Sequence, residues 1–117
     1  MEDDALLLDL HTLSTLEAAL GDDLQEVVAV LCSSLPTQIS HLQAALKGDD
    51  PAEIHRCAHS LKGCAGNVGA LALSCLARDI ERQARAEQTP AAELGARAAT
   101  LATATLQALR ERYRLPA

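Results

Sequence analysis

The feature that most restricts the fold is a long run of apolar residues at helical spacing between residues 22 and 47. Spacings of three and four residues place such side chains on one face of an α-helix, which turns by about 100° per residue. The predicted face consists of Leu24, Val27, Val28, Leu31, Leu35, Ile39, Leu42 and Leu46. Pro36 removes one backbone hydrogen bond within this helix, so a bend is expected near Cys32 rather than a break.

A dense group of helix signals follows at residues 48–53. Gly48 is suited to the position just after a helix, and Asp50 to the N-cap of the next one. Pro51 is suited to the first helical position, and Glu53 to closing a capping box with the N-cap. The sequence therefore predicts a very short connection between two antiparallel helices.

Similar signals divide the rest of the chain, in which residues of high helix propensity dominate and Phe and Trp are absent. We predict an all-α fold in one domain spanning residues 1–117. Its architecture is an antiparallel up-down four-helix bundle with an additional short N-terminal helix. The predicted helices cover residues 4–19, 22–47, 51–67, 70–87 and 90–112.

Charge and cysteine content restrict the partners and the compartment. A net charge of −6 and a pI of about 5.0 argue against nucleic acid or an anionic membrane as the main partner. No apolar stretch reaches the roughly 18 residues that span a bilayer, and acidic residues stand where a signal peptide would be basic. We expect a cytoplasmic monomer with four buried, reduced thiols, at Cys32, Cys57, Cys64 and Cys75.

The helix predicted over residues 51–67 has one solvated stripe, which carries His59, Lys62, Gly63 and Gly66. Each glycine costs roughly 1 kcal/mol relative to Ala, which makes sense if the backbone of another protein must approach His59. A neutral imidazole nitrogen can accept a phosphoryl group, and Lys62 can balance the added charge. The chain has no nucleotide-binding loop, so another protein must supply the phosphoryl donor.

Simpler interpretations of these residues stay open. His59 can be a surface histidine without a function. His55 and His59 have the spacing of a helical zinc pair, but the intervening Arg56 and the lack of a third ligand lead us to predict no metal site. Glu81 and its acidic neighbours on the helix predicted over residues 70–87 fit a solvated face.

Residues 58–70, AHSLKGCAGNVGA, resemble the pattern AHxLKGxAxxxGA of histidine-containing phosphotransfer (HPt) domains in bacterial multistep phosphorelays. The similarity is strongest over residues 50–85 and extends more loosely over most of the chain. Two departures are the Cys at position 64, where Ser is common, and the absence of Phe. Aromatic residues usual in the preceding helix are replaced here by Val27, Val28, Leu31 and Cys32.

The resemblance implies that His59 carries the phosphoryl group, usually on Nε2, and that Lys62 helps to neutralise it. It also implies site roles for Glu81 and Arg85, although an i,i+4 ion pair is a simpler interpretation of these two residues. The residues expected to contact a docked partner are Gly63, Gly66, His55, Arg56, Glu81 and Arg85.

The function implied is that of a phosphorelay intermediate, which accepts a phosphoryl group from the Asp of one receiver domain and passes it to another. Mg²⁺ is expected on the receiver, so we expect no cofactor on this chain and no kinase activity of its own. Two alternatives stay open: a non-catalytic interaction module, and the acceptor domain of a chemotaxis-type kinase. The chain is either free-standing or part of a hybrid sensor kinase, at the cytoplasmic end.

Overall fold

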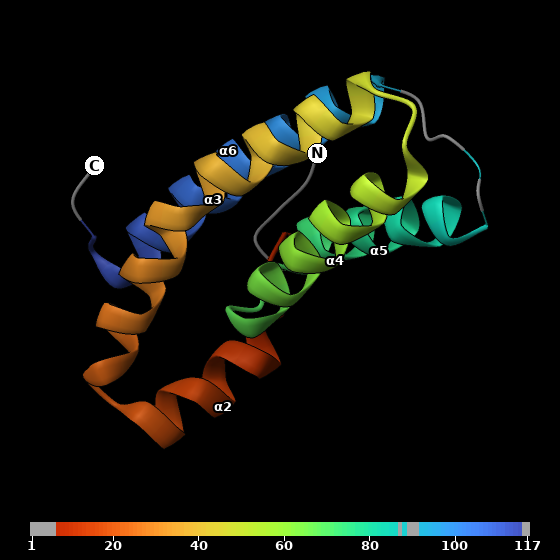
Figure 1. The fold of residues 1–117 in the computed structure, drawn as a ribbon. Helices are drawn as coiled ribbons and strands as arrows, with labels where there is room; N and C mark the ends of the chain where they lie inside the picture. Colours follow the sequence, from red (N-terminus) through yellow and green to blue (C-terminus); the bar gives the residue numbers. More distant parts are fainter. Residues whose placement is uncertain (1–6, 87, 89–91, 116–117) are drawn as a thin grey trace.

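The structure, a computed structural model, describes residues 7–86, 88 and 92–115. Its helices are α2 (Leu10–Leu20), α3 (Asp23–Lys47), α4 (Pro51–Asn67), α5 (Leu71–Arg85) and α6 (Glu93–Tyr113). The ribbon shows α3 beside α6 and α4 beside α5, with α2 lying across one end of these pairs (Figure 1). The predicted four-helix bundle with a short N-terminal helix is confirmed.

Apolar residues from each bundle helix form one buried cluster. α4 packs most extensively on α5, and α3 contacts both α4 and α6. Each fully buried Leu or Ile contributes about 1.5–3 kcal/mol by leaving water. The largest fully buried side chains of the bundle helices include Leu35, Leu42, Ile54, Leu61, Leu73, Ile80 and Leu109. Among the described residues, no helix combines the length and apolar character needed to cross a membrane.

The apolar face predicted for α3 is confirmed over most of its length. Its buried members are Leu24, Val28, Leu35, Ile39, Leu42 and Leu46. Val27 does not belong to this face: it is 41% exposed, because it lies at the margin next to Val28. Leu31 is only half-buried. Of the residues expected to replace the missing aromatics, Val28 and Cys32 therefore fill the core, whereas Val27 faces outward.

α3 continues through Pro36 without a break, as predicted. The ring leaves the carbonyl of Cys32 without its usual helical donor. Just before it, the Ser33 and Ser34 hydroxyls donate to the carbonyls three residues earlier, at 2.8 and 3.0 Å. Such back-bonding often accompanies helix bending. The ribbon changes direction in the orange half of α3 (Figure 1).

The start of α2 differs from the prediction of a helix over residues 4–19. Asp9 is the N-cap, and its carboxylate accepts hydrogen bonds from the backbone N–H and the hydroxyl of Thr12, at 3.1 and 2.8 Å. Its own N–H donates to the carbonyl of Gly69 at 2.7 Å. This cap starts α2 at Leu10 and interrupts the predicted helix at Leu8 and Asp9, while residues 4–6 lie outside the described residues.

The α3–α4 connection confirms the predicted N-cap and corrects the capping box. Asp50 accepts a hydrogen bond from the N–H of Ala52 at 3.0 Å, and Pro51 occupies the start of α4. The carboxylate of Glu53 instead accepts from Arg56 within the helix. α5 and α6 begin and end within a few residues of the predicted bounds, although residues 87 and 89–91 lie outside the described residues.

Candidate functional site

α4 has the two faces that the sequence predicted. The side chain of His59 is 65% exposed, and Gly63 and Gly66 lie on the same solvent-facing side. On the opposite side, Ile54 and Leu61 are fully buried in the core. Core packing therefore orients α4 so that His59 points away from the bundle interior.

A buried carboxylate from α5 lies at the centre of the site. The Glu81 side chain is only 3% exposed, which corrects the interpretation of Glu81 as part of a solvated face. Its Oε2 contacts Nδ1 of His59, and its Oε1 accepts a hydrogen bond from Nζ of Lys62 at 2.7 Å. Nη2 of Arg85 lies 3.8 Å from Oε1. One carboxylate thus lies within 4 Å of four other predicted site residues, His55 included.

The charge state of Glu81 determines which ring nitrogen of His59 is free. Burial by itself raises the pKa of the Glu81 carboxyl, but the hydrogen bonds and charges of Lys62 and His59 outweigh burial and hold the pKa below its usual value. An ionised carboxylate can only accept hydrogen bonds, so Nδ1 of His59 must be the donor. In the neutral imidazole this leaves the lone pair on Nε2, the nitrogen away from Glu81.

The two other α4 candidates lie in different environments. The His55 ring stacks on that of His59, with centroids 6.0 Å apart and planes at 9°, and its Nε2 lies 3.7 Å from Oε2 of Glu81. Arg56 is not brought to His59, because its guanidinium is paired with Glu53 on an exposed surface. No group of three His, Cys, Asp or Glu side chains in the described part of the chain is arranged to hold a metal ion.

The glycines of the stripe have no packing role that would exclude a side chain. A Cβ atom at Gly63 would meet nothing within 4 Å, and one at Gly66 would make ordinary contact with Oγ of Ser74 at 3.5 Å. Gly95 on α6 is a contrast, because a Cβ there would lie 3.1 Å from Cγ of Gln43. The loss of helix stability caused by Gly63 therefore has no explanation in the packing of the fold.

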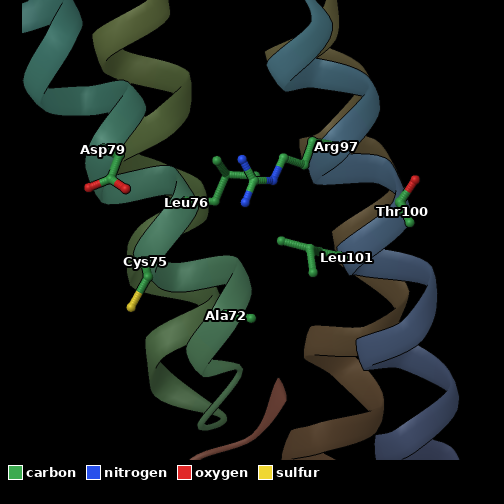
Figure 2. Close-up of a pocket in the computed structure, with 7 residues that line it drawn as sticks. All are labelled: Ala72, Cys75, Leu76, Asp79, Arg97, Thr100 and Leu101. Carbon is green, nitrogen blue, oxygen red and sulfur yellow. The ribbon is translucent and has the colours of Figure 1, made fainter. Parts of the chain in front are cut away.

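Two of the hollows on the bundle surface are lined by residues outside the Glu81 cluster. An apolar depression of about 670 Å³ lies between α2, α3 and the end of α4, lined by Leu16, Glu26, Val27, Val30, Leu31 and Asn67. A second hollow, of about 430 Å³, lies between α5 and α6, where Arg97 and Leu101 extend from α6 toward α5 (Figure 2). Its lining includes none of the predicted site residues. It does include Cys75, which is only half-buried, unlike the three other free thiols.

Comparison with known proteins identifies the family. A family model described as Hpt domain matches residues 26–112. The chain belongs to the Hpt family. This assigns the Hpt domain a role in histidine phosphotransfer within phosphorelays, where Hpt domains have receiver domains as partners. No curated protein matches the chain in a sequence search.

The fold of the Hpt domain is similar to a solved structure. The crystal structure of histidine-containing phosphotransfer protein B from Pseudomonas aeruginosa PAO1 matches with a TM-score of 0.86 and 22% sequence identity. The match covers 97% of this chain and 99% of that chain. At this identity the likeness concerns the fold, which is again the helical architecture described above.

Proposed function

We propose that this Hpt domain accepts a phosphoryl group from the aspartyl phosphate of one receiver domain onto Nε2 of His59 and passes it to a second receiver. The observation that carries the proposal is the pairing of an exposed imidazole with a buried, ionised Glu81. The carboxylate fixes the ring through Nδ1, so the nucleophilic nitrogen faces solvent, where a partner can reach it.

The proposed transfer is a displacement at phosphorus. The lone pair of Nε2 forms the P–N bond as the P–O bond to the receiver aspartate breaks, and the aspartate leaves as a carboxylate. The proton stays on Nδ1, so the ring acquires a positive charge directly beside Glu81. A charge-assisted hydrogen bond stabilises this ring more than it stabilises the neutral imidazole. Transfer to the second receiver reverses the same bond changes.

The proposal needs no cofactor on this chain. Phosphoryl transfer depends mainly on alignment and on neutralising the charge of the phosphoryl oxygens. Mg²⁺ bound to the receiver would supply most of that charge, as we predicted from the sequence. Lys62 and Arg85 bring two further cations to the edge of the site, where both contact the Glu81 carboxylate in this structure.

The surface around His59 supports docking of another protein. Gly63 leaves the helix backbone accessible, and the apolar depression begins at Asn67, one turn beyond it. Val30, at the margin of this depression, is 67% exposed. An apolar contact beside an accessible backbone fits a transient interface of modest size. We infer that a cytoplasmic monomer presents this surface.

Acid-labile phosphate on His59 tests the proposal. Purified receiver domains, phosphorylated with acetyl phosphate and Mg²⁺, are incubated with the wild type and with His59→Gln, and label on the Hpt domain is measured. We expect label on the wild type alone, with unchanged circular dichroism in both. Equal label on both proteins would show that His59 is not the phosphoacceptor.

Absence of label on a folded wild type would favour the alternatives. Label that appears only with ATP and a histidine-kinase catalytic domain would identify a kinase-dependent acceptor. Absence of label from either donor would favour a non-catalytic interaction module.

A further inference from the structure

α5 carries an exposed ridge of arginines beside the His59 site. Arg78, Arg82 and Arg85 are all exposed, and their spacings of four and three residues place them on one side of the helix. At about 100° per residue they fall within an arc of about 60°, adjacent to Glu81. At about 1.5 Å per residue, the ridge is about 10 Å long.

This arginine ridge contrasts with the charge of the rest of the chain. The net charge of the protein is −6, yet among the described residues the exposed side of α5 has three cations and one carboxylate, Asp79. Asp79 lies 4.0 Å from Nε of Arg78 and is itself 55% exposed. Arg82 has no ion pair within the described part of the chain, and Arg85 makes only the long contact with Glu81. The fold therefore leaves most of the ridge charge available to a partner.

The side of α5 that carries the ridge continues as an exposed apolar surface at the N-terminal end of the helix. Leu71, at the start of α5, lies on the same side of the helix as the arginines and is 40% exposed. The exposed surface thus extends along the whole of α5. Because α5 packs on α4, this surface lies alongside the stripe of His59, Gly63 and Gly66. A protein that docks over His59 would meet both surfaces at once.

We infer that the arginine ridge selects the receiver partner, by pairing with an acidic surface whose carboxylates are spread over about 10 Å. This inference rests on the proposed function, since the receiver must dock over His59. Complementary charge at the edge of an interface mainly accelerates association and rejects partners of the wrong charge. Because salt screens the attraction between the two charged surfaces, both effects depend on ionic strength.

The test reverses two ridge charges that do not contact Glu81. The variant Arg78→Glu with Arg82→Glu is compared with Lys47→Glu with Arg114→Glu, an equal charge change at exposed positions away from the ridge. The probes are acetyl-phosphate-labelled receiver domains with acidic docking faces, used below saturation. Initial transfer rates are measured at about 0.02 M salt and at about 1 M salt, where the Debye length falls to about 3 Å.

We expect the ridge variant to transfer at least tenfold more slowly than the wild type at low salt and within about threefold of it at high salt. The control variant should stay within about twofold of the wild type at both salt concentrations. Equal losses in both variants, or a loss that high salt does not relieve, would overturn the assignment of the ridge. A short DNA duplex that binds the wild type but not the ridge variant, with equal receiver transfer in both, would overturn it in favour of a nucleic-acid surface.

The result for the wild type separates this inference from the function on which it rests. A wild type that accepts no phosphoryl group at either salt concentration contradicts the proposed function and the ridge together. A wild type that accepts it normally, with a ridge variant that does the same, contradicts only the ridge.

Discussion

Replacing Gly63 by Gln should make the protein more stable and a poorer acceptor. A Cβ atom at Gly63 meets nothing within 4 Å, so the new side chain extends into solvent without displacing any group. The position lies on the exposed side of α4, one turn after His59. A docked receiver that needs the backbone at this point would collide with the glutamine.

The two effects have opposite signs and separate origins. Gly is about 0.8–1 kcal/mol less favourable than Ala inside a helix, and Gln is close to Ala, so the free energy of unfolding should rise by about 0.5–1 kcal/mol. For a domain of this size that is a Tm increase of roughly 3 °C. Loss of close approach should lower kcat/KM for transfer from a phosphorylated receiver at least tenfold, which corresponds to about 1.4 kcal/mol of transition-state stabilisation.

Thermal unfolding and transfer kinetics are measured on the wild type, Gly63→Ala, Gly63→Gln and Gly95→Ala. The Ala variant at position 63 should share the stability gain but lose less activity, because a methyl group protrudes less. Gly95→Ala should show no gain, because its Cβ would lie 3.1 Å from Gln43 and 3.4 Å from Leu46. A Gly63→Gln variant that is less stable, or that transfers at the wild-type rate, would refute the reasoning.

Two further predictions concern Glu81 and Asp9. Glu81→Gln should fold but lose about 10- to 100-fold in transfer rate, because a hydrogen bond to a charged group contributes about 1.5–3 kcal/mol; a transfer rate equal to that of the wild type would show that the carboxylate does not assist His59. The pKa of Asp9 is held below its ordinary value mainly by the backbone hydrogen bond from Thr12 and also by its hydroxyl. This stabilisation is present above the ordinary pKa of Asp and is lost as the pH falls through the lower pKa of the folded state. Asp9→Ala should therefore lower Tm at neutral pH and flatten the decline of Tm in acid, and identical pH profiles would contradict the cap.

Periodicity and capping signals predicted most of the fold because they act within single helices. The apolar face of α3 and the Asp50–Pro51 start of α4 depend only on nearby residues; the start is confirmed, and the face is confirmed except at Val27 and Leu31. The prediction of one continuous helix over residues 4–19 was wrong at Leu8 and Asp9, which are not helical, because helical spacing alone does not show where a polar side chain will accept hydrogen bonds from the backbone. Asp9 takes this role, and its N–H is held by Gly69, a residue far away in the sequence.

The candidate site shows more clearly that contacts between helices are not predicted by patterns within one helix. His59, Lys62 and the glycines lie on one helix, so their common stripe followed from a 100° rotation. Arg56 and His55 are neighbours on that helix, yet one pairs with Glu53 while the other stacks on His59. Both partners lie on α4 itself, but His55 also lies 3.7 Å from Oε2 of Glu81 on α5, a contact that no spacing within α4 shows. The burial of Glu81 likewise depends on how α5 is rotated against α4, which no pattern within α5 determines on its own.

Glu81 is also the residue whose position requires the most explanation in physical terms. Burying a carboxylate is costly unless charges and hydrogen bonds compensate, and pairing usually does little more than offset the loss of hydration. An apolar residue at position 81 would serve the core at least as well, since Ile80 and Ala84 beside it are already buried. What the carboxylate adds is a fixed negative charge beside Nδ1 of an exposed histidine, whose ring becomes positively charged when Nε2 takes a phosphoryl group. The burial of Glu81 is therefore better explained by the chemistry of His59 than by the stability of the bundle.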